Sequence, residues 1–136
     1  MNTLIKFFLF ILILFSSFNN TLAAYLHKEA EYQAKWCQEM NGTKEYKLED
    51  KTRVDCLTQT HAIEFDFAKK VYESIGQALY YGIMTNRKPG IVLIVENPLN
   101  DIKYINRMKP VAKSNNIDCW VMYVEDLNNF QIHPLY

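Results

Sequence analysis

The stretch "HAIEFDFAKKVYESIGQALYYGIMTNRKPGIVLIVE", residues 61–96, decides the fold of this chain. Residues 61–67 are typical of a strand, because apolar side chains alternate with other residues along most of its length. Residues 69–87 then carry apolar side chains at the period of a helix, which "NRKPG" ends. Residues 90–96 form a continuous apolar run of the kind buried on both faces. Strand, helix and strand in this order predict a crossover unit in an α/β sheet.

The residues before this crossover unit predict one more helix and two more strands. Residues 28–40 hold strong helix formers, with large apolar side chains at four-residue spacing, and Asn-Gly follows them. Residues 44–48 and 52–58 are short and strand-like, and polar turns separate them. Together with residues 61–67, they predict a three-stranded antiparallel meander.

The residues after the crossover unit predict a helix and a final strand. Residues 100–115 are amphipathic, with an interruption expected near Pro110, and residues 117–123 are a second apolar strand. The tail, residues 125–136, shows no clear pattern. The predicted fold is therefore α/β, in the order helix, three-strand meander, helix, strand, helix, strand, with a mixed central sheet flanked by helices on both faces.

The first 23 residues are predicted to be a secretory signal peptide. They contain Lys6, then the apolar run "FFLFILILF", and end in small residues that suit a cleavage site. The apolar run is shorter than the roughly 20 residues of a membrane-spanning helix, so a retained anchor is the weaker alternative. We expect residues 24–136 to be one domain, exported to the periplasm or secreted, with no stable membrane anchor after cleavage.

The charge balance gives no support to a polyanionic partner. Without Lys6, the remaining chain has 14 lysines and arginines against 15 acids. Proteins that bind nucleic acid by phosphate neutralisation alone usually carry a basic excess. Nucleic acid stays a candidate partner only if its binding is local, weak or assisted by metal ions.

The three cysteines follow the predicted signal, in a part of the chain that an oxidising compartment would receive. Cys37 lies in the first predicted helix and Cys56 in a strand expected to pack near it, so we predict a disulfide between them. Cys119 lies in an apolar strand and is expected to be a buried small side chain. Three free thiols are the alternative.

Two acids share one face of the predicted strand at residues 61–67. Side chains alternate along a strand, so Glu64 and Asp66 point away from the face of the neighbouring apolar residues. Asp55, in the preceding strand, can lie across from them if the register allows. Three buried carboxylates would repel one another, so they need a cation or an open edge. Hard divalent ions such as Mg²⁺ accept such oxygen ligands.

The helix that follows carries a polar stripe on one side. Lys70, Gln77 and Tyr81 lie close together around the helix axis and can face the three acids. A metal site with a lysine beside it is one interpretation. The other is a solvated corner, because acids at a strand exit and lysines at a helix start are common on surfaces.

These segments resemble the PD-(D/E)XK nuclease superfamily, with its restriction-endonuclease-like fold, nearest to the RecB-like and Holliday-junction-resolvase-like branches. The resemblance rests on "RVDCLT", "IEFDFAKK" and "QALYY" and on the order of the elements, and it covers most of residues 28–123. It implies that Asp55 and Glu64 hold Mg²⁺ or Mn²⁺. It also implies that Gln77 and Tyr81 form the Gln-x-x-x-Tyr helix motif and that a lysine orients the attacking water.

The chain departs from the family pattern at two positions. Val54 replaces the proline of the motif, and Asp66 stands where the lysine should be. In some members the lysine moves to the following helix, which is where Lys70 lies. Asp66 is then a third metal ligand or a partner of Lys70.

Three functions follow as alternatives. The first is a metal-dependent endo- or exonuclease acting on nucleic acid outside the cytoplasm, with Asp55, Glu64, Lys70, Gln77 and Tyr81 as catalytic residues. The second is a catalytically inactive exported member of the superfamily that acts as a binding or interaction module. The third is a small periplasmic structural protein, if the register separates Asp55 from Glu64. A homodimer is common among similar nucleases, but the sequence identifies no interface.

Overall fold

A computed structural model describes residues 24–136, and the predicted signal peptide, residues 1–23, lies outside the described residues. In this part of the chain, a six-stranded sheet has the order β1-β2-β3-β4-β5-β6. Its strands are β1 (Thr43–Lys47), β2 (Arg53–Leu57), β3 (His61–Phe67), β4 (Lys88–Val95), β5 (Asp118–Tyr123) and β6 (His133–Pro134). The helices are α2 (Glu29–Glu39), α3 (Val71–Thr85) and α4 (Pro98–Ser114), with short 3-10 turns η1 (Ala68–Lys70) and η2 (Val124–Leu127).

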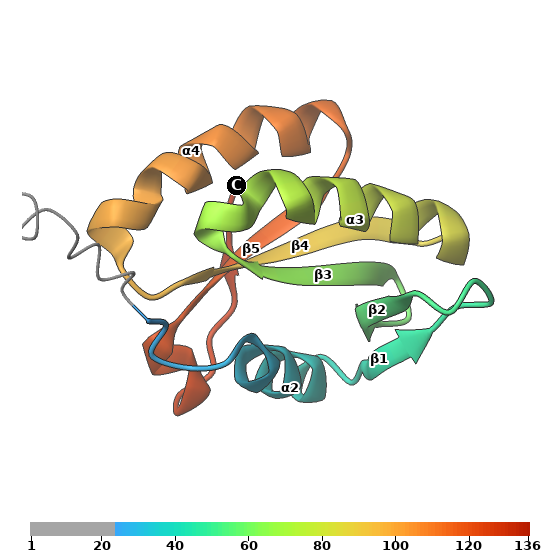
Figure 1. The fold of residues 1–136 in the computed structure, drawn as a ribbon, viewed down its shortest axis with the longest axis horizontal. Helices are drawn as coiled ribbons and strands as arrows, with labels where there is room; N and C mark the ends of the chain where they lie inside the picture. Colours follow the sequence, from blue (N-terminus) through green and yellow to red (C-terminus); the bar gives the residue numbers. More distant parts are fainter. Residues whose placement is uncertain (1–23) are drawn as a thin grey trace, which may run out of the picture.

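The sheet is mixed, and its middle is parallel. β1, β2 and β3 pair antiparallel, β3, β4 and β5 pair parallel, and β6 returns antiparallel to β5. α3 and α4 cover one face of the sheet and α2 covers the other (Figure 1). The predicted fold class is confirmed, because a meander followed by two crossover helices gives this arrangement.

Each face of the sheet buries its own core. On the α3 and α4 side, apolar residues of β4 and β5 pack against both helices, with Ile91, Leu93, Met108 and Ile117 all at most 1% exposed. On the α2 side, Tyr32 and Trp36 pack on β3, β4 and β5. The alternation of side chains along β3 and β4 therefore serves two cores.

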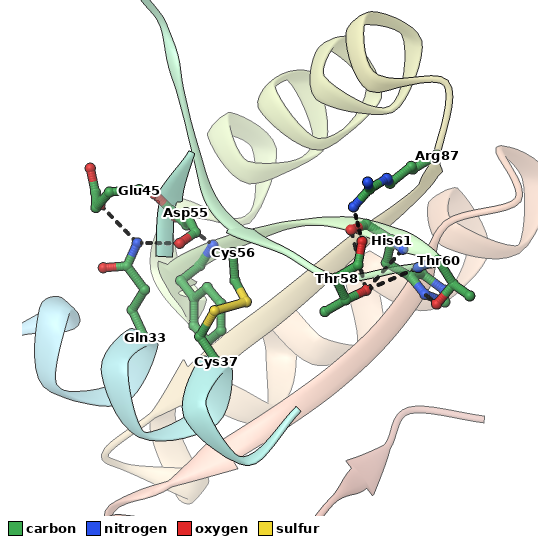
Figure 2. The surroundings of a disulfide bond; sticks show 10 residues. Gln33, Cys37, Glu45, Asp55, Cys56, Thr58, Thr60, His61 and Arg87 are labelled. Atoms are coloured by element: carbon green, nitrogen blue, oxygen red, sulfur yellow. Dashed lines mark hydrogen bonds between the residues drawn. A yellow bond between two sulfur atoms is a disulfide. The ribbon is translucent and has the colours of Figure 1, made fainter. Parts of the chain in front are cut away.

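The disulfide between Cys37 and Cys56 is confirmed, with their Cα atoms 5.7 Å apart. It ties α2 to β2 across one face of the sheet (Figure 2). A Cβ at Gly42 would collide with both sulfur atoms, so a glycine after α2 lets the chain pass over the bridge. Cys119 is buried and free, as the sequence predicts.

One sequence-based expectation was wrong in detail. α4 is not interrupted near Pro110 but continues through it to Ser114. Pro110 is exposed, so water can bond the carbonyl left without a partner, while buried Met108 and Ala112 hold both halves of the helix on the sheet.

The tail, for which the sequence shows no clear pattern, is ordered by tertiary contacts. The Asp126 carboxylate accepts hydrogen bonds from the Tyr123 amide at 2.7 Å and contacts His133 Nε2 at 3.0 Å. β6 then pairs with β5. No helix among residues 24–136 is long and apolar enough to cross a membrane.

Candidate functional site

The register between β2 and β3 brings the first two predicted acids together. Cys56 pairs with Ile63, so the next position along each strand sets Asp55 opposite Glu64 on the α3 side of the sheet. The backbone ladder stops there. Beyond that point the Asp55 side chain replaces the backbone as hydrogen-bond acceptor, because its Oδ2 accepts a hydrogen bond from the Phe65 amide at 2.8 Å. The register condition that the sequence left open is therefore met.

Glu64 is buried beside Asp55. It is 3% exposed, and its Oε1 accepts a hydrogen bond from Gln77 Nε2 of α3 at 2.7 Å. Its Oε2 is also buried and receives no hydrogen bond from a donor group in residues 24–136, and its side-chain neighbour is the carboxyl of Asp55, which can accept a proton from Glu64. A buried polar atom without a partner is costly, and such an atom among carboxylates points to a missing cation or proton.

Asp66 lies two residues after Glu64, on the same face of β3, and is likewise 3% exposed. Its Oδ1 accepts a hydrogen bond from the Phe67 amide at 2.9 Å and lies 3.5 Å from Lys70 Nζ. The Lys70 side chain is 48% exposed, so the ammonium group sits at the mouth of the cluster with water on one side. η1 makes this contact possible, because its turn between strand and helix brings Lys70 back over Asp66.

Tyr81 completes the predicted set from α3. It is 7% exposed and lies near Gln77, with Glu64 close enough to affect its ionisation. Burial, followed by the charges of Glu64 and Asp55, raises the pKa of Tyr81 to about 12, so its hydroxyl stays protonated. The structure thus brings all six predicted residues into one region.

Helix α2 adds residues that the sequence interpretation missed. Gln33 Nε2 donates to the Asp55 carbonyl oxygen at 2.9 Å and to Glu45 Oε1 at 2.8 Å (Figure 2). Glu29 is half-buried, and its carboxyl interacts with Asp55 and Asp66. Glu29 and Gln33 stand eight and four residues before Cys37, on one stripe of the helix. Because the predicted disulfide places Cys37 against Cys56 of β2, the sequence already implied that this stripe of the helix faces β2.

The pKa values report the cost of gathering these acids. Burial raises the pKa of Glu64 far above its usual range, and the neighbouring charges of Asp55 and Asp66 raise it further. Burial also raises the pKa of Asp55, against the lowering effect of the Phe65 hydrogen bond. Burial raises the pKa of Asp66 to about 7 even though Lys70 lowers it. The pKa of Glu29 rises too, first through burial and then through Asp55.

Lys70 is the cation paired with this cluster, and at neutral pH bound protons neutralise part of the remaining negative charge. Glu64 keeps its proton, while Asp66 is divided between its two forms. Within residues 24–136, no three His, Cys, Asp or Glu side chains are arranged so that their ligand atoms meet around one metal position. The region is thus a protonated acid cluster, and gathering a metal ion would require its side chains to move.

Three cavities among the described residues lie away from the acid cluster. One of about 390 Å³ is between the β1–β2 hairpin and the end of α3, one of about 480 Å³ is beside the start of α4, and one of about 270 Å³ is beside the start of β3. None of these three has Asp55, Glu64 or Asp66 in its wall.

Comparison of the chain with protein-family models, with curated proteins and with solved structures finds no match. The resemblance to the PD-(D/E)XK superfamily stays a prediction from the motifs, and any function must be inferred from the site itself.

Proposed function

We propose that the acid cluster of Asp55, Glu64 and Asp66 is a divalent-cation site and that the protein is a metal-dependent phosphodiester hydrolase, a nuclease acting on nucleic acid. The observation that carries this proposal is the buried Glu64 Oε2, which receives no hydrogen bond from a donor within residues 24–136 and has the acid Asp55 beside it in place of a cation. Buried carboxylates without enough cations are unfavourable, so their presence needs a compensating ligand. The predicted signal peptide would place this activity outside the cytoplasm.

The donor set fits a hard divalent ion. Carboxylate oxygens are the ligands that Mg²⁺ and Mn²⁺ prefer, and the cluster offers no sulfur or imidazole ligand that would favour zinc. Asp55 and Glu64 would hold the ion, with Asp66 either as a third ligand or as the partner of Lys70. A divalent ion bound there would polarise a phosphodiester and lower the pKa of a water molecule.

The remaining side chains have distinct roles in this proposal. Lys70 is half-exposed with its Nζ 3.5 Å from Asp66, so it can orient a water and stabilise negative charge on a phosphate. Gln77 holds Glu64 through its 2.7 Å hydrogen bond and fixes one carboxylate oxygen, leaving the other free to bind. Tyr81, buried behind Gln77, supports that position.

Binding of the ion is the first test. Thermal unfolding of the protein in EDTA is compared with unfolding in 10 mM Mg²⁺ or Mn²⁺ at pH 8, where the acids lose protons most readily. We expect a higher midpoint with the ion, because a ligand that binds only the folded state stabilises it. The shift should vanish in Glu64→Ala and Asp55→Ala and persist in Glu39→Ala, whose side chain pairs with Lys35 on the exposed face of α2. An unchanged midpoint in the unsubstituted protein would remove the cation site.

Cleavage is the second test. Plasmid DNA, linear DNA and single-stranded RNA are incubated with the purified protein and Mg²⁺ or Mn²⁺, and products are resolved on gels. We expect cleavage that EDTA stops and that Glu64→Ala, Asp55→Ala and Lys70→Met abolish. Cleavage that survives both carboxylate substitutions would show that the activity comes from another site.

One alternative has its own supporting observation. The ligand atoms of the acids do not meet around a common point, and the charge balance gives no basic surface for nucleic acid. The ligand-atom geometry and the lack of an overall basic excess both favour a catalytically inactive protein with the same fold that acts as a binding module. Ion-dependent stabilisation without cleavage of any of the three substrates would select this alternative.

A further inference from the structure

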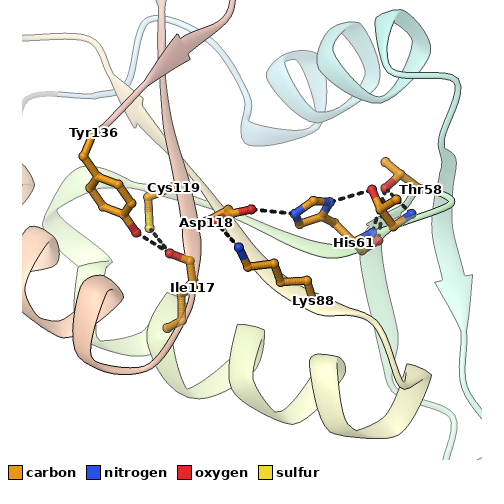
Figure 3. A network of polar contacts seen from close by, with 8 residues as sticks. Thr58, His61, Lys88, Ile117, Asp118, Cys119 and Tyr136 are labelled. Carbon is orange, nitrogen blue, oxygen red and sulfur yellow. Dashed lines mark hydrogen bonds and ion pairs between the residues drawn. The ribbon is translucent and has the colours of Figure 1, made fainter.

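A second polar cluster lies at the other end of β3, on the α2 side of the sheet. His61 Nε2 lies 2.8 Å from Asp118 Oδ2 of β5, and His61 Nδ1 lies 2.7 Å from the Thr60 hydroxyl oxygen. Lys88 Nζ of β4 donates to Asp118 Oδ1 at 2.6 Å. Figure 2 shows His61 next to Thr60 and Thr58, and Figure 3 shows the chain of contacts from His61 through Asp118 to Lys88.

The charge state of Asp118 sets the tautomer of His61. Partial burial alone would raise the pKa of Asp118, but hydrogen bonds from Lys88 and His61 outweigh it and hold the pKa below its usual range. An ionised carboxylate only accepts hydrogen bonds, so neutral His61 must donate from Nε2. Its Nδ1 is then a lone-pair acceptor for the Thr60 hydroxyl proton. A hydroxyl, an imidazole and a carboxylate in this order form the arrangement that activates a nucleophile.

The Thr60 turn is held in place by its own hydrogen bonds. Thr58 Oγ1 accepts from the His61 amide at 2.9 Å, and an Arg87 guanidinium group donates to the Thr58 carbonyl oxygen. Thr60 itself is exposed, so its hydroxyl is open to a ligand. A fixed base beside an open hydroxyl is the geometry that general-base catalysis requires.

A cavity of about 270 Å³ adjoins this hydroxyl. One side is polar, made by Thr58, Gln59, Thr60 and His61. The other side is apolar and is made by Trp36, Met40 and Trp120.

Gly90 helps to shape the apolar wall of this cavity. A Cβ at Gly90 would come within 3.0 Å of the Trp120 ring, so the glycine lets that ring lie over β4. The Trp120 ring meets the His61 ring edge to face, with their centroids 5.5 Å apart. The cavity thus has an apolar wall beside the base and the hydroxyl.

We propose that Thr60, His61 and Asp118 form an acyl-transfer site that hydrolyses small carboxylic esters whose apolar or aromatic group packs against the wall made by Trp36, Met40 and Trp120. Lys88 is already paired with Asp118, so the cavity offers no free cation and favours a neutral ester over a charged acid. Thr60 and His61 are the catalytic residues. Asp118 is a positioning residue that fixes the ring and its tautomer.

The reaction balances without any cofactor. Thr60 Oγ attacks the ester carbonyl carbon while the hydroxyl proton passes to His61 Nδ1, and the bond to the alkoxide breaks as that proton is given to the leaving alcohol. Water then attacks the acyl-threonine ester, with its proton again passing through Nδ1 to Thr60 Oγ. The carboxylic acid leaves and the threonine hydroxyl is restored. The Gln59 side-chain amide, which lines the same cavity, is a donor suited to the developing oxyanion.

The test is hydrolysis of 4-nitrophenyl acetate and 4-nitrophenyl butyrate by the purified protein in EDTA, followed by nitrophenolate absorbance. We expect saturable turnover that falls roughly 100-fold in Thr60→Val and in His61→Gln, as for loss of a general base. Thr60→Ser should keep it, and Ser114→Ala, at the exposed end of α4, should leave it unchanged. Asp118→Asn should lower kcat and move the midpoint of the pH–rate profile, which loss of packing alone would not do. Because the assay contains EDTA, its result does not depend on the proposed cation site.

Two further measurements decide how a low rate is interpreted. The tryptophan fluorescence spectrum of each variant shows whether Trp36 and Trp120 keep their surroundings. Mass spectrometry after treatment with a fluorophosphonate should place the adduct on Thr60. Turnover in Thr60→Val equal to that of the unsubstituted protein, or an adduct on another residue, would overturn the proposal. Turnover by the unsubstituted protein no faster than free imidazole would overturn it too.

Discussion

The two ends of β3 carry polar residues in opposite states. At its first residue, His61 and Lys88 surround the single carboxylate of Asp118, and both oxygens of that carboxylate have partners. Near its last residues, three carboxyl groups meet one lysine, and Glu64 Oε2 receives no hydrogen bond from a donor within residues 24–136. The pKa of Asp118 is lowered while those of Asp55, Glu64 and Asp66 are raised. A site that is satisfied within the chain and one that is not can thus be told apart by the direction of these shifts.

The largest test of this comparison is the dependence of stability on pH without divalent ions. The folded-state pKa of Asp66, about 7, lies above the unfolded value of 3.8, so the folded protein binds the proton more tightly. Stability should therefore fall as pH rises from about 4 to about 8, by on the order of 4 kcal/mol at roughly 1.4 kcal/mol per pKa unit. Urea unfolding in EDTA at pH 4.5 and pH 8 measures this. Equal or greater stability at pH 8 would contradict it, and Asp66→Asn should reduce the dependence to the part that Asp55 and Glu64 contribute.

Removal of the disulfide tests a feature that both ends share, because α2 packs over both. Cys37→Ala combined with Cys56→Ala should lower the free energy of unfolding by about 3 kcal/mol, the entropy expected for a loop closed across 19 positions. Urea unfolding measures the loss, and the unsubstituted protein treated with a reductant is the matched comparison. Titration of the denatured protein should find one thiol before reduction and three after it. A loss well below 1 kcal/mol would show that core packing alone holds α2 in place.

Neutral replacements at the two ends should have opposite signs. Glu64→Gln keeps the shape and the Gln77 contact but removes a carboxyl whose ionisation is unfavourable, so it should stabilise the protein at pH 8 by about 2 kcal/mol and change little at pH 4.5. Asp118→Asn removes a partly exposed carboxylate that pairs with Lys88 and accepts a hydrogen bond from His61, and it should destabilise the protein by about 1 kcal/mol at pH 7. Both are measured by urea unfolding. Destabilisation by Glu64→Gln at pH 8 would show that the Glu64 carboxyl, like that of Asp118, stabilises the fold, and the two ends of β3 would not differ in this respect.

The smallest expected effect concerns the lysine at the acid end. Lys70→Met removes an exposed cation 3.5 Å from Asp66, and we expect a loss of about 0.5 kcal/mol at pH 8. Lys69→Met is the matched control, since Lys69 lies over the Tyr25 ring and not over the acids. NMR titration of the Asp66 carboxyl should show a higher pKa in Lys70→Met and no change in the control. Equal shifts in both variants would mean that the lysines act only through overall charge.

Much of the fold was predictable because local periodicity and burial agree along this chain. The alternation in residues 61–67 and the helical period in residues 69–87 each matched the observed element to within a few residues. Pro110 misled because one missing hydrogen bond costs less than the packing of Met108 and Ala112 gains. The tail had no pattern of its own, since its order comes from Asp126 and from pairing with β5.

The candidate site was predictable as a set of residues but not as an environment. Strand alternation and helix spacing placed Glu64, Asp66, Lys70, Gln77 and Tyr81 on facing surfaces, because both rules act over a few residues. The position of Asp55 opposite Glu64 was conditional on the register of β2 and β3, which the structure supplied. Burial of the acids and the approach of Glu29 depend on how α2 and α3 pack across the sheet. The spacing of residues along the chain does not predict how these helices pack across the sheet.

The sequence by itself determined the order and type of the elements up to residue 123 and that Glu64 and Asp66 share a face of β3, since these follow from chain geometry over short distances. It favoured the Cys37–Cys56 pairing with free thiols as the alternative, and the structure decided for the pairing. Only the tertiary structure decided which carboxylates are neutralised within the chain. That outcome depends on the surroundings of each oxygen, and groups distant in sequence supply them, as Lys88 and His61 do for Asp118. For Glu64 Oε2, the described part of the chain supplies no such group.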